Sequence, residues 1–523
     1  MSMYETLALT LDLDLSERKY DVLKNYVNRV HAGLMPTLYS LNNFKKQFYP
    51  KIMYASDTQV QVDAQDMLNK TINSLFLMLE EEILKNYCSS SEFVVVFKWG
   101  MDGSSGHSTY KLPFRDESNI DQETVQNTDQ ESDHETDSET DQETGQNTEK
   151  DPISQTDEFL FFIAFLPIFV KEKQSGSIVW RNPRPSSPHY CRPLKFMFCK
   201  ENKDITLQEY KRFDDLFKNA IEKCDVNINN KFVNVESEFH FTMIDGKVCD
   251  IVSGTNSCSV CVICKAKPTA MNSLDVEKFI PNKENYKYGL STLHCWIRFL
   301  ECCLKIAFRL QVEEWKETEQ YKALKKTKTK EDKREIQIIG KKLKADTKKR
   351  IQQEMKVSLG LNISKPKQGF GSSNDGNTAR TFFQKHEITS NITGLDHQLL
   401  VNFHVILRLL NCKEDLNLEK FDELTKETLS LYMAKYQWYK LPQTVHKILI
   451  HGSEVMRNFD FPVAFLAEDA LEATHKDIRS ERDGRTRKRS RVESNIDLMN
   501  RLALKSDPHV TSFRCSALKK KKK

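Results

Sequence analysis

The sequence predicts an α/β core, built on a mixed sheet, that carries large all-α additions. Two apolar runs, at residues 93–97 and 159–170, are typical of strands buried on both faces. Two long segments, at residues 62–87 and 292–315, carry apolar residues at helical spacing. A chain of 523 residues is also long enough for more than one domain.

The first 90 residues are predicted to form a helical N-terminal region. Within this region, residues 16–30 and 62–87 each place apolar side chains along one face of a helix. Packing against a core explains both stripes, and we assign them no other role.

The strand predicted at residues 93–97 leads into the sequence Trp-Gly-Met-Asp-Gly at residues 99–103. Asp102 therefore stands where a buried strand is expected to stop, between two glycines that free the backbone. A carboxylate held there by a rigid strand can bind a divalent cation. The alternative is that Asp102 and Gly103 form a hairpin turn, for which Asp-Gly is a favoured pair.

An acidic tract follows at residues 116–158, where sixteen Asp and Glu residues stand against one Lys. The tract is polar and repetitive, so it is predicted to be a disordered insertion in a surface loop. The net charge of this tract is −15. Because the whole chain carries a net charge of +4, the rest of the chain carries +19. A basic body of this kind is typical of proteins that bind nucleic acids.

Several strands and one helix are predicted between the acidic tract and residue 255. The strands are expected at residues 159–170, 177–180, 194–199, 232–235 and 239–244, and the helix at residues 207–223. Several strands, a helix and a further strand suit a ribonuclease-H-like core, whose first part spans residues 91–255. Other α/β folds share this pattern, so the pattern by itself leaves them open.

Two overlapping Cys-x-x-Cys pairs, formed by Cys258, Cys261 and Cys264, lie in a loop-like segment at residues 256–290. One such pair is half of a zinc site, since two thiolates at this spacing can bind one ion tetrahedrally. The alternative is a set of buried, reduced cysteines.

The missing half of this zinc site is predicted at His446 and His451, whose spacing suits metal ligands. On a regular helix these two positions point about 140° apart. A shared ion therefore requires the helix to end or bend between them. A zinc ion bound by both halves would join two distant segments of the chain.

The segment between the two halves, at residues 291–455, is predicted to be helical. Residues 322–356 are dense in Lys and Arg, which fits a solvated helix better than one that faces phosphate groups. A glycine-rich loop at residues 369–380 opens a helix, and its exposed amides could hold a phosphate. Asn377 and Arg380 in this loop are candidate contacts to nucleic acid.

The C-terminal part is predicted to be one helix followed by a basic tail. Residues 456–482 contain the helix, which carries Glu468, Asp469 and Glu472. Residues 483–523 form the tail. Its basic run is a candidate nuclear localisation signal, a DNA-binding arm or both. The candidate DNA contacts in this run are Arg485, Arg487, Lys488 and Arg489.

The apolar runs and the N-terminal residues predict the cellular compartment of the protein. The longest apolar run, at residues 159–170, is too short to span a bilayer as a helix, and the N-terminus lacks a signal-peptide pattern. Thirteen cysteines without such a signal suggest reduced thiols inside the cell. We therefore expect no membrane partner and, given the basic runs, a nuclear location.

Six short motifs stand in order between about residues 92 and 500. They are the segment Met-Asp-Gly-Ser-Ser-Gly-His around Asp102, the pair Cys261 and Cys264, the run Leu293-His294-Cys295, the run Asn-Asp-Gly-Asn-Thr-Ala-Arg at residues 374–380, the pair His446 and His451, and Glu472 shortly before Lys476. Together they resemble the catalytic subunit of the V(D)J recombinase, the recombination-activating protein one-like family, and the related Transib-type DDE transposases.

The resemblance implies a ribonuclease-H-like fold that nicks DNA and then transfers the strand. Asp102 and Glu472 match the first and third catalytic carboxylates, which would bind Mg²⁺ or Mn²⁺. The two Cys and two His ligands named above match a structural Zn²⁺ site. Aligned on Leu-His-Cys, the resemblance places the second carboxylate at position 296, where this chain has Trp296. Glu301, five residues later, is a weak substitute because it points well away on a helix.

The resemblance also implies double-stranded DNA, such as transposon ends, as the partner of a homodimer, and it leaves open an accessory subunit. Two other functions stay open. A catalytically inactive, transposon-derived DNA-binding protein would keep the fold without the second carboxylate. A helical scaffold would bind partner proteins through the acidic and basic segments, and its binding would lack the strong salt dependence of DNA binding.

Overall fold

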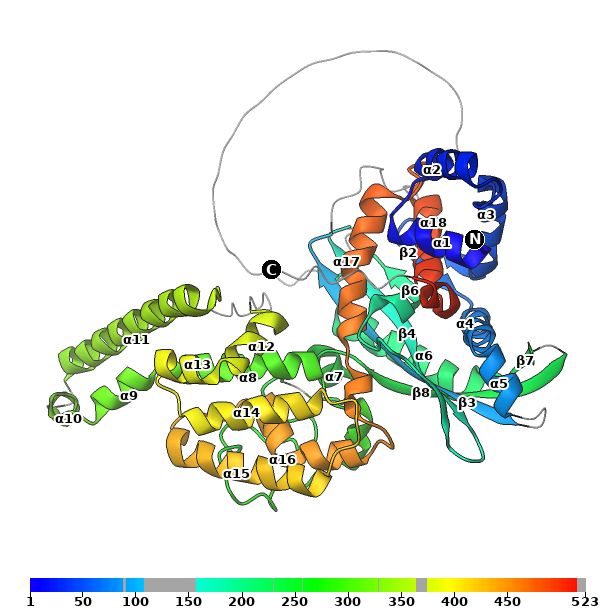
Figure 1. Ribbon diagram of the computed structural model, residues 1–523. Helices are drawn as coiled ribbons and strands as arrows, with labels where there is room; N and C mark the ends of the chain where they lie inside the picture. The colour runs from blue at the N-terminus through cyan, green and yellow to red at the C-terminus, as the bar shows by residue number, and fades with distance from the viewer. Residues whose placement is uncertain are drawn as a thin grey trace, which may run out of the picture.

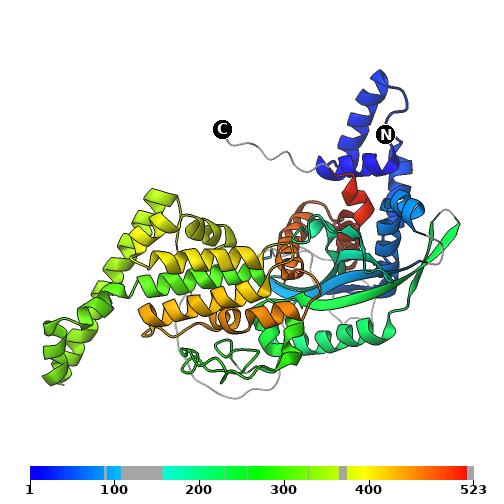
Figure 2. The same cartoon turned by 60° about the horizontal axis from the view of Figure 1, so that its bottom comes forward.

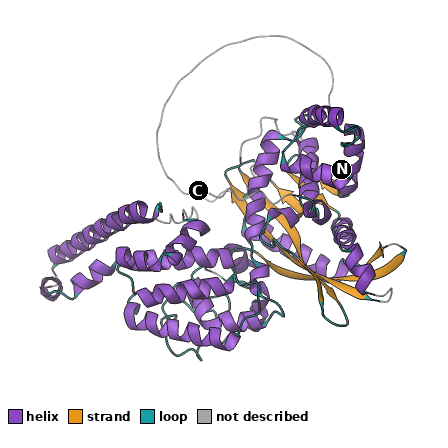
Figure 3. Cartoon of the chain, in the orientation of Figure 1, coloured by secondary structure: helices purple, strands orange, loops and turns teal. Residues whose placement is uncertain are grey.

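A computed structural model of the chain describes residues 1–87, 91–107, 157–228, 230–255, 257–327, 329–363 and 374–514. It shows a mixed sheet wrapped by helices from both ends of the chain, and beside it a body made of helices (Figures 1 and 3). The predicted mixed sheet with large helical additions is therefore confirmed. None of the helices in these ranges is long and apolar enough to cross a lipid bilayer.

One sheet contains all the strands of the described residues. They are β1 Ile52–Ala55, β2 Gln59–Val62, β3 Glu92–Ser105, β4 Phe159–Glu172, β5 Ile178–Arg181, β6 Arg192–Met197, β7 Cys224–Ile228 and β8 Lys231–Met243. Their order in space is β1-β2-β6-β4-β3-β8-β7, with β5 paired to β4. Strands β3 and β8 run parallel, and the other pairs are antiparallel.

The helices around the sheet come from three parts of the chain. The N-terminal ones are α1 Met3–Asp12, α2 Glu17–Val30, α3 Leu38–Lys45, η1 Lys46–Phe48, α4 Ala64–Met78 and α5 Glu80–Asn86. The central ones are η2 Pro188–Tyr190, α6 Lys203–Asp215, η3 Leu216–Ala220 and α7 Gly246–Val252. The C-terminal ones are η5 Val463–Leu466, α17 Asp469–Gly484, α18 Arg491–Lys505 and α19 Pro508–Ser512.

The separate helical body is formed by the long middle part of the chain. Its elements are η4 Lys283–Tyr288, α8 Thr292–Ala307, α9 Leu310–Lys316, α10 Glu319–Thr327, α11 Lys330–Leu359, α12 Gly376–Gln384, α13 His386–Thr393, α14 His397–Leu410, α15 Leu418–Tyr436 and α16 Gln443–Arg457. Helix α8 is central to this body because it packs against α12, α14 and α16.

The two central strands, β3 and β4, are buried on both faces, which explains their continuous apolar runs. Lys98 and Trp99 are neighbours on β3 and therefore point to opposite faces. Trp99 stacks on Tyr210 of α6. Lys98 Nζ donates a hydrogen bond of 2.5 Å to the carbonyl oxygen of Ala467, just before α17. Helices α6 and α17 thus cover opposite faces of the sheet.

Some predicted strands differ from the observed ones. Residues 52–62, inside the region 1–90 that was predicted to be helical, form the hairpin of β1 and β2 at the edge of the sheet. Strand β7 was not predicted, although its residues alternate between buried and exposed. The strands predicted at residues 232–235 and 239–244 are one strand, β8. Its polar middle residues stay in register with β3 and so continue the ladder.

The two ends of the chain pack together beside the sheet (Figure 1). Leu7, Tyr20 and Leu41 from the N-terminal helices share a small core with Leu504 of α18 and Val510 of α19. The N-terminal region is therefore held in place by the C-terminal helices.

The prediction of a basic tail at residues 483–523 is wrong for residues 491–512, which form α18 and α19. Leu498 and Leu502 lie one helical turn apart and are both buried. The Ser490 side chain caps the start of α18. Charged neighbours hid this apolar face in the sequence. The five terminal lysines lie outside the described residues.

The predicted acidic tract lies outside the described residues, apart from its last two positions. At its base, the His107 amide donates a hydrogen bond of 3.1 Å to the Glu158 carbonyl oxygen. Asp157 is buried and accepts hydrogen bonds from Arg482 of α17 and Arg491 of α18, at 2.6 and 2.9 Å. Asp157 and Glu158 therefore belong to the ordered fold, and the prediction of disorder is wrong for these two residues.

Helices α9 to α11 project away from the rest of the molecule (Figure 2). Along α11 the buried residues are Thr347, Ile351 and Met355, all in its C-terminal half. Most of its Lys and Arg side chains are exposed. This agrees with the solvated helix predicted within residues 322–356.

The close approach of β3 and β8 generates a first prediction. A Cβ atom on Gly100 would lie 1.9 Å from the Met243 carbonyl oxygen, and backbone atoms cannot move aside. We expect Gly100→Ala to force the strands apart and to destabilise the fold by about 1–3 kcal/mol, as overpacking does. Thermal unfolding followed by circular dichroism measures this. Gly484→Ala is the control, because nothing lies within 4 Å of the added atom. Equal melting temperatures for both variants would contradict the prediction.

Candidate functional site

The parallel pair of β3 and β8 brings two carboxylates together at one end of the sheet. Gly100 on β3 pairs with Met243 on β8. Asp102 lies two residues further along β3, and Asp245 lies two residues beyond the end of β8, so both stand at this end of the sheet. Asp245 also begins α7, where its side chain accepts a hydrogen bond of 2.8 Å from the Val248 amide.

Glu472 reaches the same place from the first turn of α17, which packs against both strands. Asp102, Asp245, Glu468 and Glu472 together line a pocket of about 610 Å³, which we call the carboxylate pocket. The other titratable side chains in its lining are His294, His475, Lys476 and Arg479. The structure thus brings the predicted Asp102 and Glu472 into one pocket.

The local structure around Asp102 differs from both predictions made for it. Strand β3 does not stop before Asp102 but continues to Ser105, and Asp102 pairs with Phe162 of β4. Asp102 and Gly103 therefore do not form a hairpin turn. Gly103 is needed for a different reason: a Cβ atom there would lie 2.7 Å from the Cβ of Glu201.

Negative charges crowd the carboxylate pocket. Burial, and then the charge of Asp102, raise the pKa of Asp245. Burial also raises the pKa of Glu472; the charge of His294 opposes this shift and that of Asp102 adds to it. Divalent cations would relieve this repulsion, and carboxylate oxygens are the ligands that Mg²⁺ and Mn²⁺ prefer. The residues of the pocket therefore fit the cations that the resemblance implies.

The carboxylates of the pocket are spaced more widely than the ligands of a compact metal site. Among the described residues, the group of three or more potential ligands that lie within 4.8 Å of one another consists of Cys and His side chains elsewhere in the fold.

Glu468 is occupied by an ion pair. It is buried, its Oε1 lies 2.9 Å from His294 Nδ1, and it also accepts a hydrogen bond from the Ser291 hydroxyl. Burial opposes a charge on His294, but the hydrogen bond to Glu468 and the charges of Glu468, Asp245 and Glu472 outweigh it and raise the His294 pKa to about 9. One oxygen of Glu468 is therefore held by His294 and Ser291, whereas its Oε2 is buried without a hydrogen-bond partner in the described structure.

A chain of hydrogen bonds leads away from Asp102. His475 Nε2 lies 3.0 Å from Asp102 Oδ2, and His475 Nδ1 lies 3.1 Å from the Ser104 hydroxyl. The same hydroxyl lies 2.6 Å from His107 Nε2. A hydroxyl can donate to one ring and accept from the other, so it fixes the orientation of His475. His475 in turn holds Asp102, as outer groups around metal ligands do.

Trp296 lies away from the carboxylate pocket. Its ring is 3% exposed and packs inside the helical body, 6.1 Å from the Phe383 ring. Glu301 is also buried there, and its Oε2 lies 2.8 Å from Arg298 Nη1. Neither side chain lines the pocket. Position 296, where the resemblance places the second carboxylate, therefore lies outside the carboxylate pocket, and so does Glu301.

Asp245 is the pocket residue that the sequence interpretation missed. Its signal was present, because the apolar strand predicted at residues 239–244 is followed by Asp245-Gly246. Asp102-Gly103 follows an apolar strand in the same way. What the sequence could not supply was the parallel pairing that places the two Asp-Gly steps next to each other.

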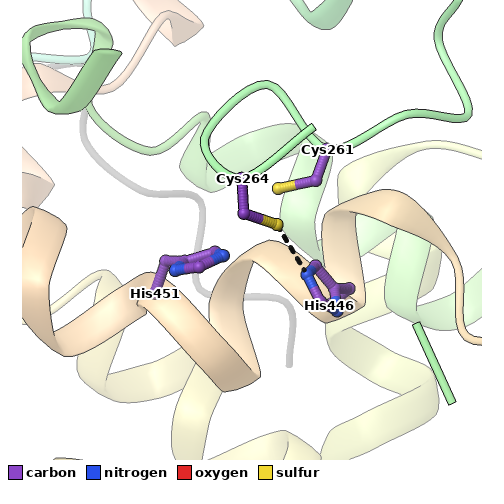
Figure 4. A group of neighbouring side chains, drawn as sticks. All are labelled: Cys261, Cys264, His446 and His451. Atoms are coloured by element: carbon purple, nitrogen blue, oxygen red, sulfur yellow. Dashed lines mark hydrogen bonds between the residues drawn. The ribbon is translucent and has the colours of Figure 1, made fainter. Parts of the chain in front are cut away.

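Cys261, Cys264, His446 and His451 form a second site, which we call the Cys-His cluster. Their potential ligand atoms all lie within 4.8 Å of one another, and three of the four residues are buried. Figure 4 shows the two cysteines on a loop and the two histidines on α16, with Cys264 Sγ 3.4 Å from His446 Nε2. The predicted meeting of these two distant segments is confirmed.

The donor set of the Cys-His cluster fits a metal ion. Two thiolates and two imidazoles at tetrahedral spacing are typical ligands of zinc. The Cys264 thiol, and then the two histidines beside it, hold the pKa of Cys261 well below its usual range. His451 Nε2 is buried without a hydrogen-bond partner in the described structure, so it is left for a metal ion.

The predicted break between the two histidines does not occur. Helix α16 is continuous from Gln443 to Arg457 and contains both His446 and His451. Their ring centroids still lie 5.5 Å apart. The two imidazole rings lie several bonds from the helix axis. The side chains can therefore lean toward each other although their Cα positions point about 140° apart around the helix.

The candidate contacts to nucleic acid are scattered. Arg380 on α12 lies over the Trp296 ring, at 5.9 Å from its centroid, and 4.0 Å from Asp469 at the start of α17. Asn377 is exposed on the same helix. Arg485 forms an ion pair with Asp14 and is only partly exposed. The next basic residues, Arg487, Lys488 and Arg489, are exposed between α17 and α18.

Comparison with known proteins adds no assignment. No family model matches the chain, and no curated protein matches it in sequence. The interpretation of the two sites therefore rests on their geometry and on the motifs in the sequence.

The Cys-His cluster predicts the metal content of the protein. We expect the purified chain to hold one zinc ion, measured by plasma mass spectrometry, and Cys261→Ser to lose it because a hydroxyl is a poor zinc ligand. Cys258→Ser is the matched control, since Cys258 is exposed and outside the cluster. Zinc retained by Cys261→Ser, or lost from Cys258→Ser, would contradict the assignment.

The chain of hydrogen bonds predicts a role for His475 in metal affinity. We expect His475→Ala to weaken Mn²⁺ binding, measured by titration calorimetry, about tenfold, since Asp102 loses the group that orients it. His475→Gln should recover part of the loss because its amide can donate to Asp102. His397→Ala, on the exposed surface of α14, should bind like wild type. Tighter binding by His475→Ala would instead show that His475 competes with the ion.

Proposed function

We propose that this protein is a DNA-cutting and DNA-joining enzyme of the recombinase and transposase class, with a ribonuclease-H-like core. One observation carries the proposal: Asp102, Asp245 and Glu472 come from two parallel strands and a crossing helix and line one pocket. The order of elements supports the fold: β3, β4 and β6 lie side by side and antiparallel, with the short β5 at the edge of β4, and α6 and β7 then lead to β8, which is parallel to β3.

Mg²⁺ or Mn²⁺ bound by these three carboxylates would activate the attacking oxygen and stabilise the leaving oxygen of a phosphodiester. The side chains of the pocket have separate tasks. His475 holds Asp102 in place. Lys476 and Arg479 are exposed cations in the pocket lining, where they can bind the phosphates of a DNA strand.

The alternative of a catalytically inactive DNA-binding protein depended on Trp296. With Trp296 packed in the helical body and Asp245 in the pocket, that alternative loses its main support. Double-stranded DNA as the partner, a homodimer, structural zinc and a nuclear location follow from the resemblance and stay predictions.

The decisive experiment is the nicking of supercoiled plasmid DNA by the purified chain in Mg²⁺ and in Mn²⁺. We expect wild type to nick the plasmid, and Asp102→Asn, Asp245→Asn and Glu472→Gln each to lower the rate at least ~100-fold, as loss of a group that stabilises transition-state charge does. Glu427→Gln, on the exposed surface of α15, should nick like wild type. Glu301→Gln should lower the rate far less than the three variants above, because Glu301 lines an adjoining cavity and not the carboxylate pocket.

The control and the three variants separate the competing functions. If Glu301→Gln abolished nicking while Asp245→Asn did not, the assignment of Asp245 would be wrong. If wild type bound DNA in a salt-dependent way without nicking it in either metal, the protein would be a DNA-binding protein only.

A further inference from the structure

A second cavity, of about 670 Å³, adjoins the carboxylate pocket. The two cavities share Asp245 and His294 in their linings, so they meet at these residues. The other walls of the second cavity come from α7, α8, the start of α16 and the loop that carries the Cys-His cluster. A chain-like ligand that crosses these two residues would contact both cavities.

Lys447 on α16 lines this second cavity and is only 9% exposed. It follows His446 directly, so the Cys-His cluster fixes its backbone. No hydrogen-bond partner of its ammonium group is found in the described structure. The ammonium group is not among the buried polar atoms that lack a partner, so it is open to the cavity that Lys447 lines. A cation that faces a cavity and has no hydrogen bond to the protein can bind an anionic ligand there.

The carboxylates of the second cavity do not cancel its positive charge. Arg298 partly neutralises Glu301. Burial raises the pKa of Asp250 to about 7, against the opposing charge of Lys447, so this carboxyl is only partly charged near neutral pH. Lys305 and Lys440 add exposed cations to the lining. The cavity as a whole suits an anion.

We propose that the second cavity binds a backbone phosphate of the single DNA strand that leaves the carboxylate pocket, with Lys447 as the deep cation and Lys305 and Lys440 at the rim. The inference rests on the proposed function, because it takes the DNA to be cut as the ligand. The size of the cavity lies within the range of pockets for small ligands, about 300–1,000 Å³. A volume of about 670 Å³ is too small to enclose a B-form duplex, whose major groove alone is about 12 Å wide.

The test measures binding without chemistry. The full chain, in EDTA, is titrated into a fluorescein-labelled duplex with a single-stranded overhang and into the same duplex with blunt ends, and anisotropy gives the affinity at several salt concentrations. We expect Lys447→Met to weaken binding of the overhang duplex at least about tenfold. We also expect the slope of log affinity against log salt to fall by about 0.7, the value for one phosphate contact on a single strand.

The variants are chosen to separate a binding role from a structural one. Lys447→Met must keep its zinc and its melting temperature to be interpreted. The double variant Lys305→Gln with Lys440→Gln changes exposed residues, so it should fold and should show the same loss more weakly. Lys420→Met removes an exposed cation of α15 that lies outside both cavities, and it should bind like wild type.

The outcomes distinguish this inference from the proposed function. Unchanged affinity and salt slope for Lys447→Met and for the double variant, while wild type nicks plasmid, would overturn the phosphate site and leave the enzyme intact. An equal loss on overhang and blunt duplexes would also overturn it, because the cavity excludes a duplex. Competition by millimolar inorganic phosphate as strong as that by the oligonucleotide would make free phosphate the ligand and refute a strand.

Discussion

The parallel pairing of β3 with β8 is the constraint on which the rest of the site depends. It fixes Gly100 beside Met243. Asp102 and Asp245 follow these two residues in the chain, and both line the carboxylate pocket. The approach is so close that only a glycine fits at position 100. Helix α17 then needs only to cross the ends of these two strands to add Glu472. Lys98, buried under the start of α17, anchors that crossing through the Ala467 carbonyl oxygen.

The Cys-His cluster connects the helical body to this pocket. Its cysteine loop follows α7, which begins at Asp245, and its histidines lie on α16, which packs against α8. Helix α8 carries His294, the partner of Glu468. A metal ion in the cluster would therefore tie α7 to α16 and so hold the wall that lies between the two cavities. Its contribution would be to geometry, at a distance from the reacting phosphate.

Much of the fold and part of the site could be predicted from the sequence, and the failures share a cause. The long apolar strands, the amphipathic helices and the four residues of the Cys-His cluster carry strong local patterns. Asp245 carried an equally good local signal, an Asp-Gly step after an apolar strand, but its value depends on a non-local parallel pairing. Trp296 shows the opposite case. It directly follows a matching motif in the sequence, but the motif does not reveal which side of α8 faces the pocket, and Trp296 is buried on another side. Strand β7 and helix α18 were missed because charged neighbours outweighed short alternating or periodic signals.

The hydrogen bond between His107 and Glu158, with Asp157 buried between two arginines, has a consequence for how this gene can change. The central hairpin of β3 and β4 is closed at that point, so the fold fixes the positions of His107 and Asp157. For a flexible connection between two fixed ends, each doubling of its length costs only about 0.6 kcal/mol. A repetitive segment between these two positions can therefore become longer or shorter at little cost while β3 and β4 keep their register. Variation in length is thus cheap at the base of this hairpin, next to a pocket whose geometry leaves almost no freedom.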